Sequence, residues 1–360
     1  AAESAGKAGL SVLLIEKNNL GGVCLNEGCI PTKTLLYSAK TYDSAKHASK
    51  YAINVSEVSF DLSKIIVRKS KVVRKLVLGV KAKLASNNVA IVSGEAQIID
   101  KNTVRCGEET YEGENLILCT GSETFIPPIP GVETVNYWTH RDALDNKELP
   151  ASLAIVGGGV IGMEFASFFN SLGVQVTVVE MLDEILGGMD KELSALLRAE
   201  YAKRGIKFLL STKVVGLSQT EGGAVVSYEN AEGSGNVVAE KLLMSVGRRP
   251  VTKGFGLENL NLEKTERGAV KVDEKMQTSV PGVYVCGDLT GFSLLAHTAV
   301  REAEVAVHSI LGKEDTMSYR AIPGVVYTNP EIAGVGETEE SASAKGITCQ
   351  VIKLPMAYSG

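Results

Sequence analysis

The sequence predicts an α/β protein in which one strand-containing unit occurs twice. The repeat consists of AGLSVLLIE at residues 8–16 and LGVQVTVVE at residues 172–180. In each copy a glycine at a predicted helix end precedes an apolar strand, and a glutamate follows that glycine by seven positions. A helix followed by a strand in this way is typical of a βαβ unit. The 360 residues also exceed one ordinary core of about 100 to 200 residues, so two or three domains are expected.

The second copy is preceded by a complete nucleotide-binding pattern. Residues 153–156 (LAIV) predict a short strand, residues 157–162 (GGGVIG) a glycine-rich turn, and the following residues a helix ending near Gly173. Gly157 and Gly159 would let the backbone approach a pyrophosphate at the helix N-terminus, and Gly162 would allow close packing of helix on strand. Glu180, 23 residues after Gly157, would bind a ribose diol and repel a 2′-phosphate. This spacing favours NAD over NADP.

The same offset places the turn of the first copy upstream of residue 1. Residues 1–9 (AAESAGKAG) are then the end of the helix that follows that turn, and Glu16 is the corresponding acid. We therefore expect a strand and a phosphate-binding turn before Ala1 in the natural protein.

The remaining elements follow from periodicity and from turn residues. Apolar residues at helical spacing predict helices, alternating runs between glycines predict strands, and proline-rich stretches predict domain ends. These predictions are helices at 34–50, 61–86 and 294–311, strands within 89–121, a proline-rich end at 125–131, a linker at 145–152, a strand-rich stretch at 206–246, and a new segment near residue 319.

Composition and charge exclude several classes of function. Hydrophobic residues make up 44% of the chain and glycine occurs 37 times, which is typical of a globular protein. A net charge of −5 leaves no basic surface for nucleic acid, so no such partner is expected. No apolar run approaches the roughly 20 residues that span a bilayer, and no leader-like segment opens the chain. The sequence predicts no membrane partner and a cytoplasmic location, or the mitochondrial matrix in a eukaryote.

Two of the six cysteines, Cys24 and Cys29, lie in the motif GGVCLNEGCIPTK at residues 21–33. Metal binding needs more ligands than this pair provides, and no second cysteine pair or neighbouring histidine completes a set, so no metal site is expected. The other four cysteines stand alone in the sequence and are expected to be packing residues: Cys106, Cys119, Cys286 and Cys349.

The spacing of Cys24 and Cys29 favours a disulfide that opens easily. In a regular helix, residues five apart have Cα atoms roughly 8 to 9 Å apart, whereas a disulfide needs them below about 7 Å. Closing the pair therefore requires a distorted turn, which Gly28 and Pro31 are suited to provide. So small a loop adds little stability, which favours a redox-active pair over a structural one.

The charges around the pair also bear on its chemistry. The helix N-terminus and Lys33 would favour a thiolate, while Glu27 would oppose it. A hydride does not pass directly to a disulfide, so a flavin between the nucleotide and the thiols is expected, bound by the first repeat unit.

The motif GGVCLNEGCIPTK resembles the active-site signature of the class I pyridine nucleotide-disulfide oxidoreductases. Segments similar to those of this family follow in the expected order at residues 116–131, 157–167, 246–250, 283–291, 294–299 and 327–340. The resemblance implies two Rossmann-like domains, for FAD and NAD, and the start of an α+β dimerisation domain. The implied divisions are 1–148 for FAD, 149–269 for NAD, 270–317 for a return to the FAD domain, and 318–360 for the interface domain.

The resemblance also implies roles for individual residues. Cys24 would exchange with the substrate, Cys29 would contact the flavin, and Lys33 would lie near the flavin and pair with Glu164. The residues implied for FAD are Glu16, Lys33, Ala96, Thr120, Gly121, Ser122, Asp288, Leu294, Leu295, Ala296 and His297. Those implied for NAD are Gly157, Gly158, Gly159, Val160, Ile161, Gly162, Glu164, Glu180, Val214 and Gly247.

The activity implied by the resemblance is oxidation of dihydrolipoamide with reduction of NAD⁺ through FAD. The implied partners are a second copy of the chain and the lipoyl domain of an acyltransferase within a multienzyme complex. Two alternatives stay open: a related NAD(P)H-dependent disulfide or mercuric reductase, which Glu180 disfavours if NADP is required, and a non-catalytic binding subunit, which the intact cysteine motif disfavours.

His297 and Glu302 have the five-residue spacing of the acid/base pair that this family uses at the exchanging thiol. We do not assign them to that role, because residues 294–299 resemble the family's flavin-side helix. The acid/base pair is expected beyond residue 360.

Overall fold

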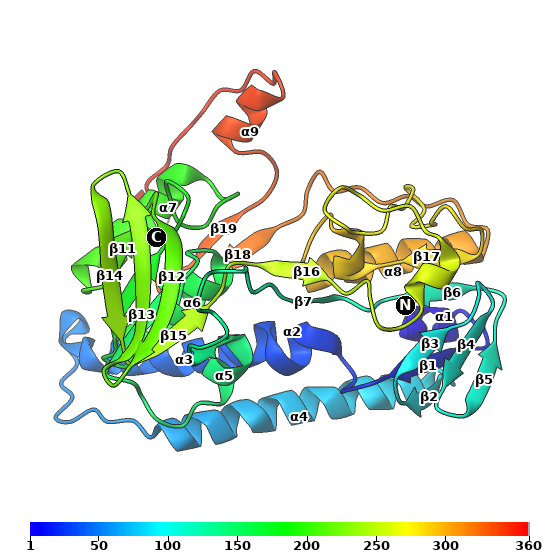
Figure 1. Ribbon diagram of the computed structural model, residues 1–360, viewed down its shortest axis with the longest axis horizontal. Helices are drawn as coiled ribbons and strands as arrows, with labels where there is room; N and C mark the ends of the chain where they lie inside the picture. Colours follow the sequence, from blue (N-terminus) through cyan, green and yellow to red (C-terminus); the bar gives the residue numbers. More distant parts are fainter. Residues whose placement is uncertain (359–360) are drawn as a thin grey trace.

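The computed structural model describes residues 1–358 and has two lobes (Figure 1). The lobe at the right of Figure 1 contains the first repeat unit, and the lobe at the left contains the second. The long helix α4 (Leu62–Ser86) runs along the lower side of both lobes. The mixed α/β architecture predicted from the sequence is confirmed.

The first lobe is assembled from distant parts of the chain. Helix α1 (Ala2–Lys7) leads to β1 (Leu13–Glu16), which pairs in parallel with β2 (Ala90–Ser93). A three-stranded antiparallel sheet follows, of β3 (Ala96–Ile98), β4 (Thr103–Cys106) and β5 (Glu109–Glu112). Strand β6 (Leu116–Leu118) pairs in parallel with β17 (Val283–Val285), so the chain returns to this lobe late in the sequence. Helix α8 (Ala296–Ile310) follows.

Three helices carry the cysteine motif and its support. The segment that holds the cysteine motif forms two helices, α2 (Gly22–Glu27) and α3 (Cys29–Lys46), and the short 3₁₀ helix η1 (Ala48–Tyr51) completes it. The Asp61 carboxylate caps α4 by accepting a 3.0 Å hydrogen bond from the Lys64 amide, so this helix begins where the sequence predicts.

The second lobe is built around a five-stranded parallel sheet. Its strand order is β11 (Lys207–Leu209), β10 (Gln175–Val179), β9 (Ser152–Val156), β15 (Lys241–Met244) and β8 (Tyr137–Trp138). Helices α6 (Val160–Ser171) and α7 (Lys191–Lys203) belong to the same unit. The strands are apolar because helices and loops cover both faces of the sheet. Strand β8 lies before residue 149, the start of the NAD domain expected from the sequence. It nevertheless joins this sheet by pairing in parallel with β15.

The remaining elements extend the second lobe and connect it to the first. The antiparallel strands β12 (Lys213–Thr220), β13 (Gly223–Asn230) and β14 (Gly233–Ala239) form one sheet. Strands β7 (Ser122–Thr124) and β16 (Arg248–Pro250) pair between the lobes (Figure 1). The others are α5 (His140–Asp145), η2 (Leu257–Leu260), η3 (Gly287–Thr290), β18 (Gly324–Val326), β19 (Ile332–Gly334), α9 (Glu339–Ala344) and η4 (Met356–Tyr358).

The repeat inferred from the sequence is also present in the backbone. Gly9 and Gly173 both have positive φ, of 86° and 95°. After α1 the Leu10 amide donates to the Ala5 carbonyl at 3.1 Å, and after α6 the Val174 amide donates to the Phe169 carbonyl at 3.0 Å. Both helices therefore end in the same left-handed glycine cap, which turns the chain into the next strand.

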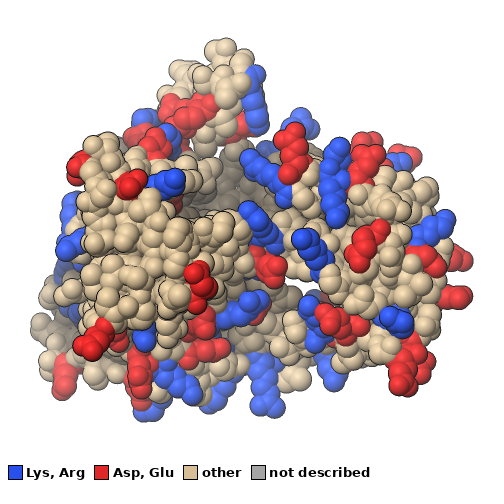
Figure 2. All heavy atoms as spheres, in the orientation of Figure 1, with Lys and Arg blue, Asp and Glu red and all other residues tan. Residues whose placement is uncertain are grey.

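Charged side chains of both signs are interspersed over both lobes on the face shown in Figure 2. Within residues 1–358, the helices are all too short or too polar to cross a bilayer.

Candidate active site

The two motif cysteines lie on either side of a break between helices. Cys24 is in α2, Cys29 is the first residue of α3, and Gly28 separates the helices. Both side chains are half-buried free thiols that lie within hydrogen-bonding reach of each other. The break brings the thiols closer than a continuous helix would, and the distortion predicted at Gly28 is confirmed.

The break at Gly28 leaves little room for a side chain. A Cβ atom added to Gly28 would lie 3.0 Å from the Val23 carbonyl oxygen and 3.1 Å from the Cys24 Cα. These neighbours are backbone atoms of the helix that holds Cys24, so they cannot move without moving the thiol. The glycine therefore sets the approach of the two cysteines.

The two thiols differ in their ionisation. The hydrogen bond from Cys24, helped by the Lys33 ammonium, lowers the pKa of Cys29 to about 6, although burial opposes the shift. The hydrogen bond to Cys29, followed by burial, raises the pKa of Cys24. At neutral pH the pair therefore carries one thiolate, on Cys29, at the N-terminal end of α3, where the helix dipole also favours an anion.

A lysine and a buried glutamate meet near this thiolate at Tyr327. The Lys33 Nζ lies 4.0 Å from the centroid of the Tyr327 ring. The Glu164 Oε1 accepts a 3.0 Å hydrogen bond from the Tyr327 amide. The direct ion pair expected between Lys33 and Glu164 does not form within 4.0 Å in the described part of the chain. Tyr327 instead contacts both groups, Lys33 through its ring and Glu164 through its backbone amide.

Glu164 is an unusual carboxyl group. Burial raises its pKa to about 7, and the Cys29 thiolate adds to the shift, while the Tyr327 amide and Lys33 oppose it. The carboxyl reaches this position because α3 and α6 pack together through Leu35 and Phe165, both 1% exposed, in one hydrophobic cluster. Glu164 can therefore gain or lose a proton near neutral pH beside the redox pair.

Glu27, which was expected to oppose a thiolate, is neutralised by an arginine from another element. Arg141 of α5 binds both carboxylate oxygens of Glu27 through Nε and Nη2, at 2.5 and 2.6 Å. This pairing lowers the pKa of Glu27. The ion pair also fixes the end of α2 against α5.

The glycine-rich turn has the form expected for binding a nucleotide. Gly157 has φ of 103°, and Gly159 caps the N-terminus of α6. A Cβ atom at Gly162 would lie 2.0 Å from the carbonyl oxygen of Gly157, which directly follows β9, so α6 packs closely on the end of this strand. A Cβ atom at Gly159 would meet nothing within 4 Å, so this part of the turn is open. Glu180 follows β10 and accepts a 2.6 Å hydrogen bond from the Gly158 amide.

The structure brings several of the residues predicted for FAD together at the junction of the lobes. The Ser122 hydroxyl donates a 2.5 Å hydrogen bond to the Asp288 carboxylate and accepts one of 2.7 Å from Arg248. The Asp288 carboxylate is close enough to Cys29 to raise its pKa slightly. The Thr120 hydroxyl donates to the Val251 carbonyl at 3.0 Å. These contacts place the start of η3 and the start of β7 beside the cysteines.

The other predicted residues lie on the elements that the sequence indicated. Val160 and Ile161 are in the first turn of α6, Val214 is on β12, and Gly247 immediately precedes β16. Glu16 ends β1, Ala96 begins β3, Gly121 precedes β7, Leu294 and Leu295 lead into α8, and Ala296 and His297 begin it.

The His297 and Glu302 side chains have separate partners. His297 Nε2 contacts the Pro323 carbonyl oxygen at 2.9 Å. Glu302 is fully buried, where it accepts hydrogen bonds of 2.5 Å from the Gly287 amide and 2.7 Å from the Tyr319 hydroxyl. These contacts agree with the decision not to assign His297 and Glu302 as the acid/base pair.

Comparison with known proteins decides the family. Residues 1–303 match the family described as pyridine nucleotide-disulphide oxidoreductase, and residues 322–360 match the dimerisation domain of that family. The chain belongs to the pyridine nucleotide-disulphide oxidoreductase family. Its expected class, an oxidoreductase, and its expected cofactors, FAD and NAD, are those of this family.

Relatives within this family share most of their length with the chain. It is 38% identical to a dihydrolipoyl dehydrogenase of Geobacillus stearothermophilus over 100% of this chain and 77% of the relative. A dihydrolipoyl dehydrogenase of Thermus scotoductus is 40% identical over 98% of this chain and 76% of the relative. Among solved structures, the flavoprotein disulfide reductase RclA of Escherichia coli is similar with a TM-score of 0.85 and 31% identity, covering 99% of this chain and 79% of that one.

Three residues of the site were not predicted from the sequence. Tyr327, Arg141 and Arg248 lie far from the cysteine motif in the sequence and reach it through the fold. Tyr327 lies in a segment that resembles the family, at residues 327–340, which was the available signal. Arg248 lies in another such segment, at residues 246–250, whereas Arg141 stands in no motif that could have indicated its position.

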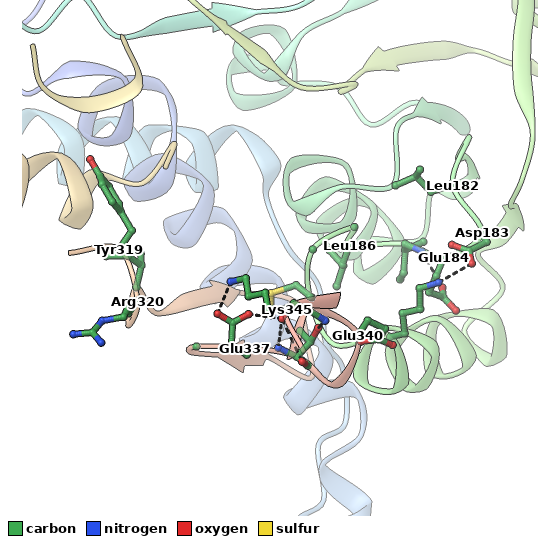
Figure 3. Close-up of a pocket in the computed structure, with 18 residues that line it drawn as sticks. Leu182, Asp183, Glu184, Leu186, Tyr319, Arg320, Glu337, Glu340 and Lys345 are labelled. Carbon is green, nitrogen blue, oxygen red and sulfur yellow. Dashed lines mark hydrogen bonds and ion pairs between the residues drawn. The ribbon is translucent and has the colours of Figure 1, made fainter. Parts of the chain in front are cut away.

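A cavity of about 540 Å³ lies elsewhere in the molecule (Figure 3). Leu182, Asp183 and Leu186 line one side of it, and Tyr319 and Glu337 line the other. Its ion pairs, such as Lys345 with Glu337 at 2.6 Å, are formed by largely exposed side chains. None of the lining residues is among the predicted site residues, so this cavity is not part of the redox site.

Proposed function

We propose that this chain is a dihydrolipoamide dehydrogenase, which oxidises dihydrolipoamide and reduces NAD⁺. The observation that supports it best is the asymmetric pair of cysteines, in which Cys29 holds a thiolate with a pKa of about 6 and Cys24 stays protonated. A buried carboxyl group and a nucleotide-type turn on the same chain agree with this activity. The names of the relatives at 38% and 40% identity point to the same substrate.

The chemistry assigned to the cysteines balances in electrons and protons. In the oxidised protein, one thiolate of dihydrolipoamide attacks the Cys24 sulfur, breaks the Cys24–Cys29 bond and leaves Cys29 as a thiolate. The second substrate thiol attacks the mixed disulfide and closes the lipoamide ring. Cys24 then takes one proton and the other is released to solvent. The low pKa of Cys29 makes it the better leaving group in the first step.

The residues of the chain fit the two cofactors. For NAD, the open turn at Gly157 and Gly159 would hold the pyrophosphate, and the Glu180 carboxylate would hold the ribose. For FAD, the linked Ser122 and Asp288 lie beside Cys29 and would face the flavin side of the pair. FAD supplies the two-electron transfer between the dithiol and the nicotinamide. Lys33 and Glu164 would hold charge and a proton next to that transfer.

We also propose that the protein acts as a homodimer within a multienzyme complex. The match of residues 322–360 to a dimerisation domain supports the dimer. The lipoyl domain of an acyltransferase is the partner that would deliver dihydrolipoamide to Cys24.

The test is a comparison of substrates on the purified, cofactor-loaded protein. We expect NADH formation from dihydrolipoamide and NAD⁺, with little activity when NADP⁺ replaces NAD⁺. Cys29→Ser should abolish this turnover while some NADH oxidation by a dye acceptor persists. Full turnover in Cys29→Ser would refute the assignment.

The alternatives predict different outcomes in the same assays. Faster reduction of glutathione disulfide or Hg²⁺ with NADPH than oxidation of dihydrolipoamide would favour a related reductase. A flavin absorbance that dihydrolipoamide does not bleach would favour a non-catalytic binding subunit.

A further inference from the structure

A second pair of cysteines lies side by side on neighbouring strands. Cys119 immediately follows β6 and Cys286 immediately follows β17, and these strands pair in parallel with Leu118 opposite Val285. The Cys286 amide donates a 3.1 Å hydrogen bond to the Leu118 carbonyl, so the pairing continues to the cysteines. Cys286 packs in a hydrophobic cluster, as the sequence predicts. Although 167 positions separate Cys119 from Cys286 in the sequence, the pairing of β6 with β17 makes them neighbours.

Strand geometry puts the two thiols on the same face. Side chains alternate along a strand, so Cys119 shares a face with Ile117, and Cys286 shares one with Tyr284. Cys286, Tyr284 and Ile117 pack in one cluster with Ala303 of α8, which confirms this face. Neighbouring strands lie about 4.7 to 4.9 Å apart, and disulfides span Cα distances of about 4.4 to 6.8 Å. The thiols are within hydrogen-bonding reach of each other.

The two thiols are chemically unequal. Cys119 is exposed, whereas Cys286 is 2% exposed. The hydrogen bond from Cys286 lowers the pKa of Cys119. The hydrogen bond to Cys119, then burial, and also the carboxylate of Glu302, raise the pKa of Cys286. Cys119 is thus the more acidic and the more exposed of the two thiols.

We propose that Cys119 and Cys286 form a second redox pair, which a two-electron oxidant of the peroxide class closes to a disulfide. This pair is separate from Cys24 and Cys29 and is not needed for the proposed activity. Cys119 lies shortly before β7 and Cys286 directly before η3, and the hydrogen bond from Ser122 to Asp288 joins these two elements. A bond between Cys119 and Cys286 would lock β7 and η3 together.

The reaction proceeds in two steps that balance. The Cys119 thiolate attacks an oxygen of hydrogen peroxide, gains a hydroxyl to become a sulfenic acid, and releases hydroxide. The Cys286 thiol then attacks the Cys119 sulfur, forms the S–S bond and breaks the S–O bond, and its proton leaves with the hydroxyl as water. One peroxide is reduced to one water and one hydroxide, and the hydroxide becomes a second water by taking up the proton that Cys119 released on ionising. Two thiols are oxidised to one disulfide.

The experiment maps disulfides in the full-length, cofactor-loaded protein. The protein is reduced, freed of reductant, treated with hydrogen peroxide, alkylated in denaturant, digested and analysed by mass spectrometry. We expect a reducible cross-linked peptide that joins Cys119 to Cys286, in addition to the one that joins Cys24 to Cys29. If Cys119 and Cys286 both carry the alkylating label when Cys24 and Cys29 are fully cross-linked, the proposal is overturned.

Single substitutions test the order of the steps. In Cys286→Ala, a dimedone probe should label Cys119 as its sulfenic acid, because nothing resolves it. In Cys119→Ala, dimedone should not label Cys286. The matched control is Cys106→Ala, which removes a buried cysteine of the same lobe and should leave the cross-link intact. Dimedone labelling of Cys286 in Cys119→Ala, or none of Cys119 in Cys286→Ala, would contradict the assigned order.

Discussion

At the scale of single residues, the site depends on an unequal pair of thiols. Cys24 and Cys29 have the same chemistry in the unfolded chain, whereas the fold lowers the pKa of Cys29 to about 6 and raises the pKa of Cys24. The hydrogen bond from Cys24 and the charge of Lys33 place the negative charge on Cys29.

Removing the hydrogen bond from Cys24 or the charge of Lys33 should raise the pKa of Cys29 to different extents. In Cys24→Ala the hydrogen-bond donor is lost, and in Lys33→Met only the charge is lost, so we expect a rise of about one unit for Lys33→Met and a larger one for Cys24→Ala. Thiolate absorbance measured against pH in the reduced protein checks both values. An unchanged midpoint in Cys24→Ala would show that the hydrogen bond does not set the pKa.

At the scale of elements, two glycines control how helices meet their neighbours. Gly28 separates α2 from α3 so that these helices bring the thiols together, and Gly162 lets α6 approach the nucleotide turn. Both roles arise because neighbouring backbone atoms leave no room for a Cβ atom, and not because glycine prefers turns.

Gly28→Ala should impair the redox pair more than the fold. The new Cβ atom would press on the Val23 carbonyl and the Cys24 Cα, so we expect slower closure of the Cys24–Cys29 disulfide and reduced dihydrolipoamide turnover. Peroxide-driven closure, followed by alkylation and mass spectrometry, measures this rate. The matched control is Gly79→Ala in α4, where nothing lies within 4 Å; it should close the disulfide at the wild-type rate and gain about 0.5 to 1 kcal/mol of stability.

Gly162→Ala and Gly159→Ala should distinguish the packing of α6, which depends on Gly162, from the binding of NAD⁺, which depends on Gly159. The first places a Cβ atom 2.0 Å from the Gly157 carbonyl oxygen, so we expect a loss of about 1 to 3 kcal/mol in the free energy of unfolding. The second meets nothing within 4 Å, so the protein should stay nearly as stable while its KM for NAD⁺ rises. Chemical denaturation and steady-state kinetics test the two effects. Equal stability of both variants would contradict the packing role of Gly162.

At the scale of the whole molecule, the packing of α3 against α6 and the contact with Tyr327 bury Glu164 beside the thiolate. Its pKa is raised from 4.5 in the unfolded chain to about 7, so its contribution to stability is fully present below pH 4.5 and is lost as the pH rises through 7. That loss corresponds to at most about 3 kcal/mol.

Glu164→Gln should remove this pH dependence. The amide oxygen can still accept the hydrogen bond from the Tyr327 amide, and no charge forms. Compared with the wild type, the variant should gain stability as the pH rises from 5 to 8, by up to about 3 kcal/mol. Urea denaturation of the reduced proteins at both pH values measures the difference. A constant difference across this range would show that Glu164 does not titrate there.

The sequence alone determined the features that local chemistry encodes. The repeat of glycine, strand and glutamate, the turn at residues 157–162 and the motif around Cys24 and Cys29 each follow from spacing along the chain. The α/β class and the family could therefore be predicted. The helix was predicted to distort at Gly28 because the spacing of the thiols required it.

Only the tertiary structure decided the contacts between distant segments. Tyr327 stands between Lys33 and Glu164, Arg141 neutralises Glu27, and the pairing of β6 with β17 makes neighbours of Cys119 and Cys286. Packing of helices and pairing of strands depend on the whole chain, because each contact needs two surfaces that are far apart in sequence. No local pattern contains that information, so these partners became visible only in the folded protein.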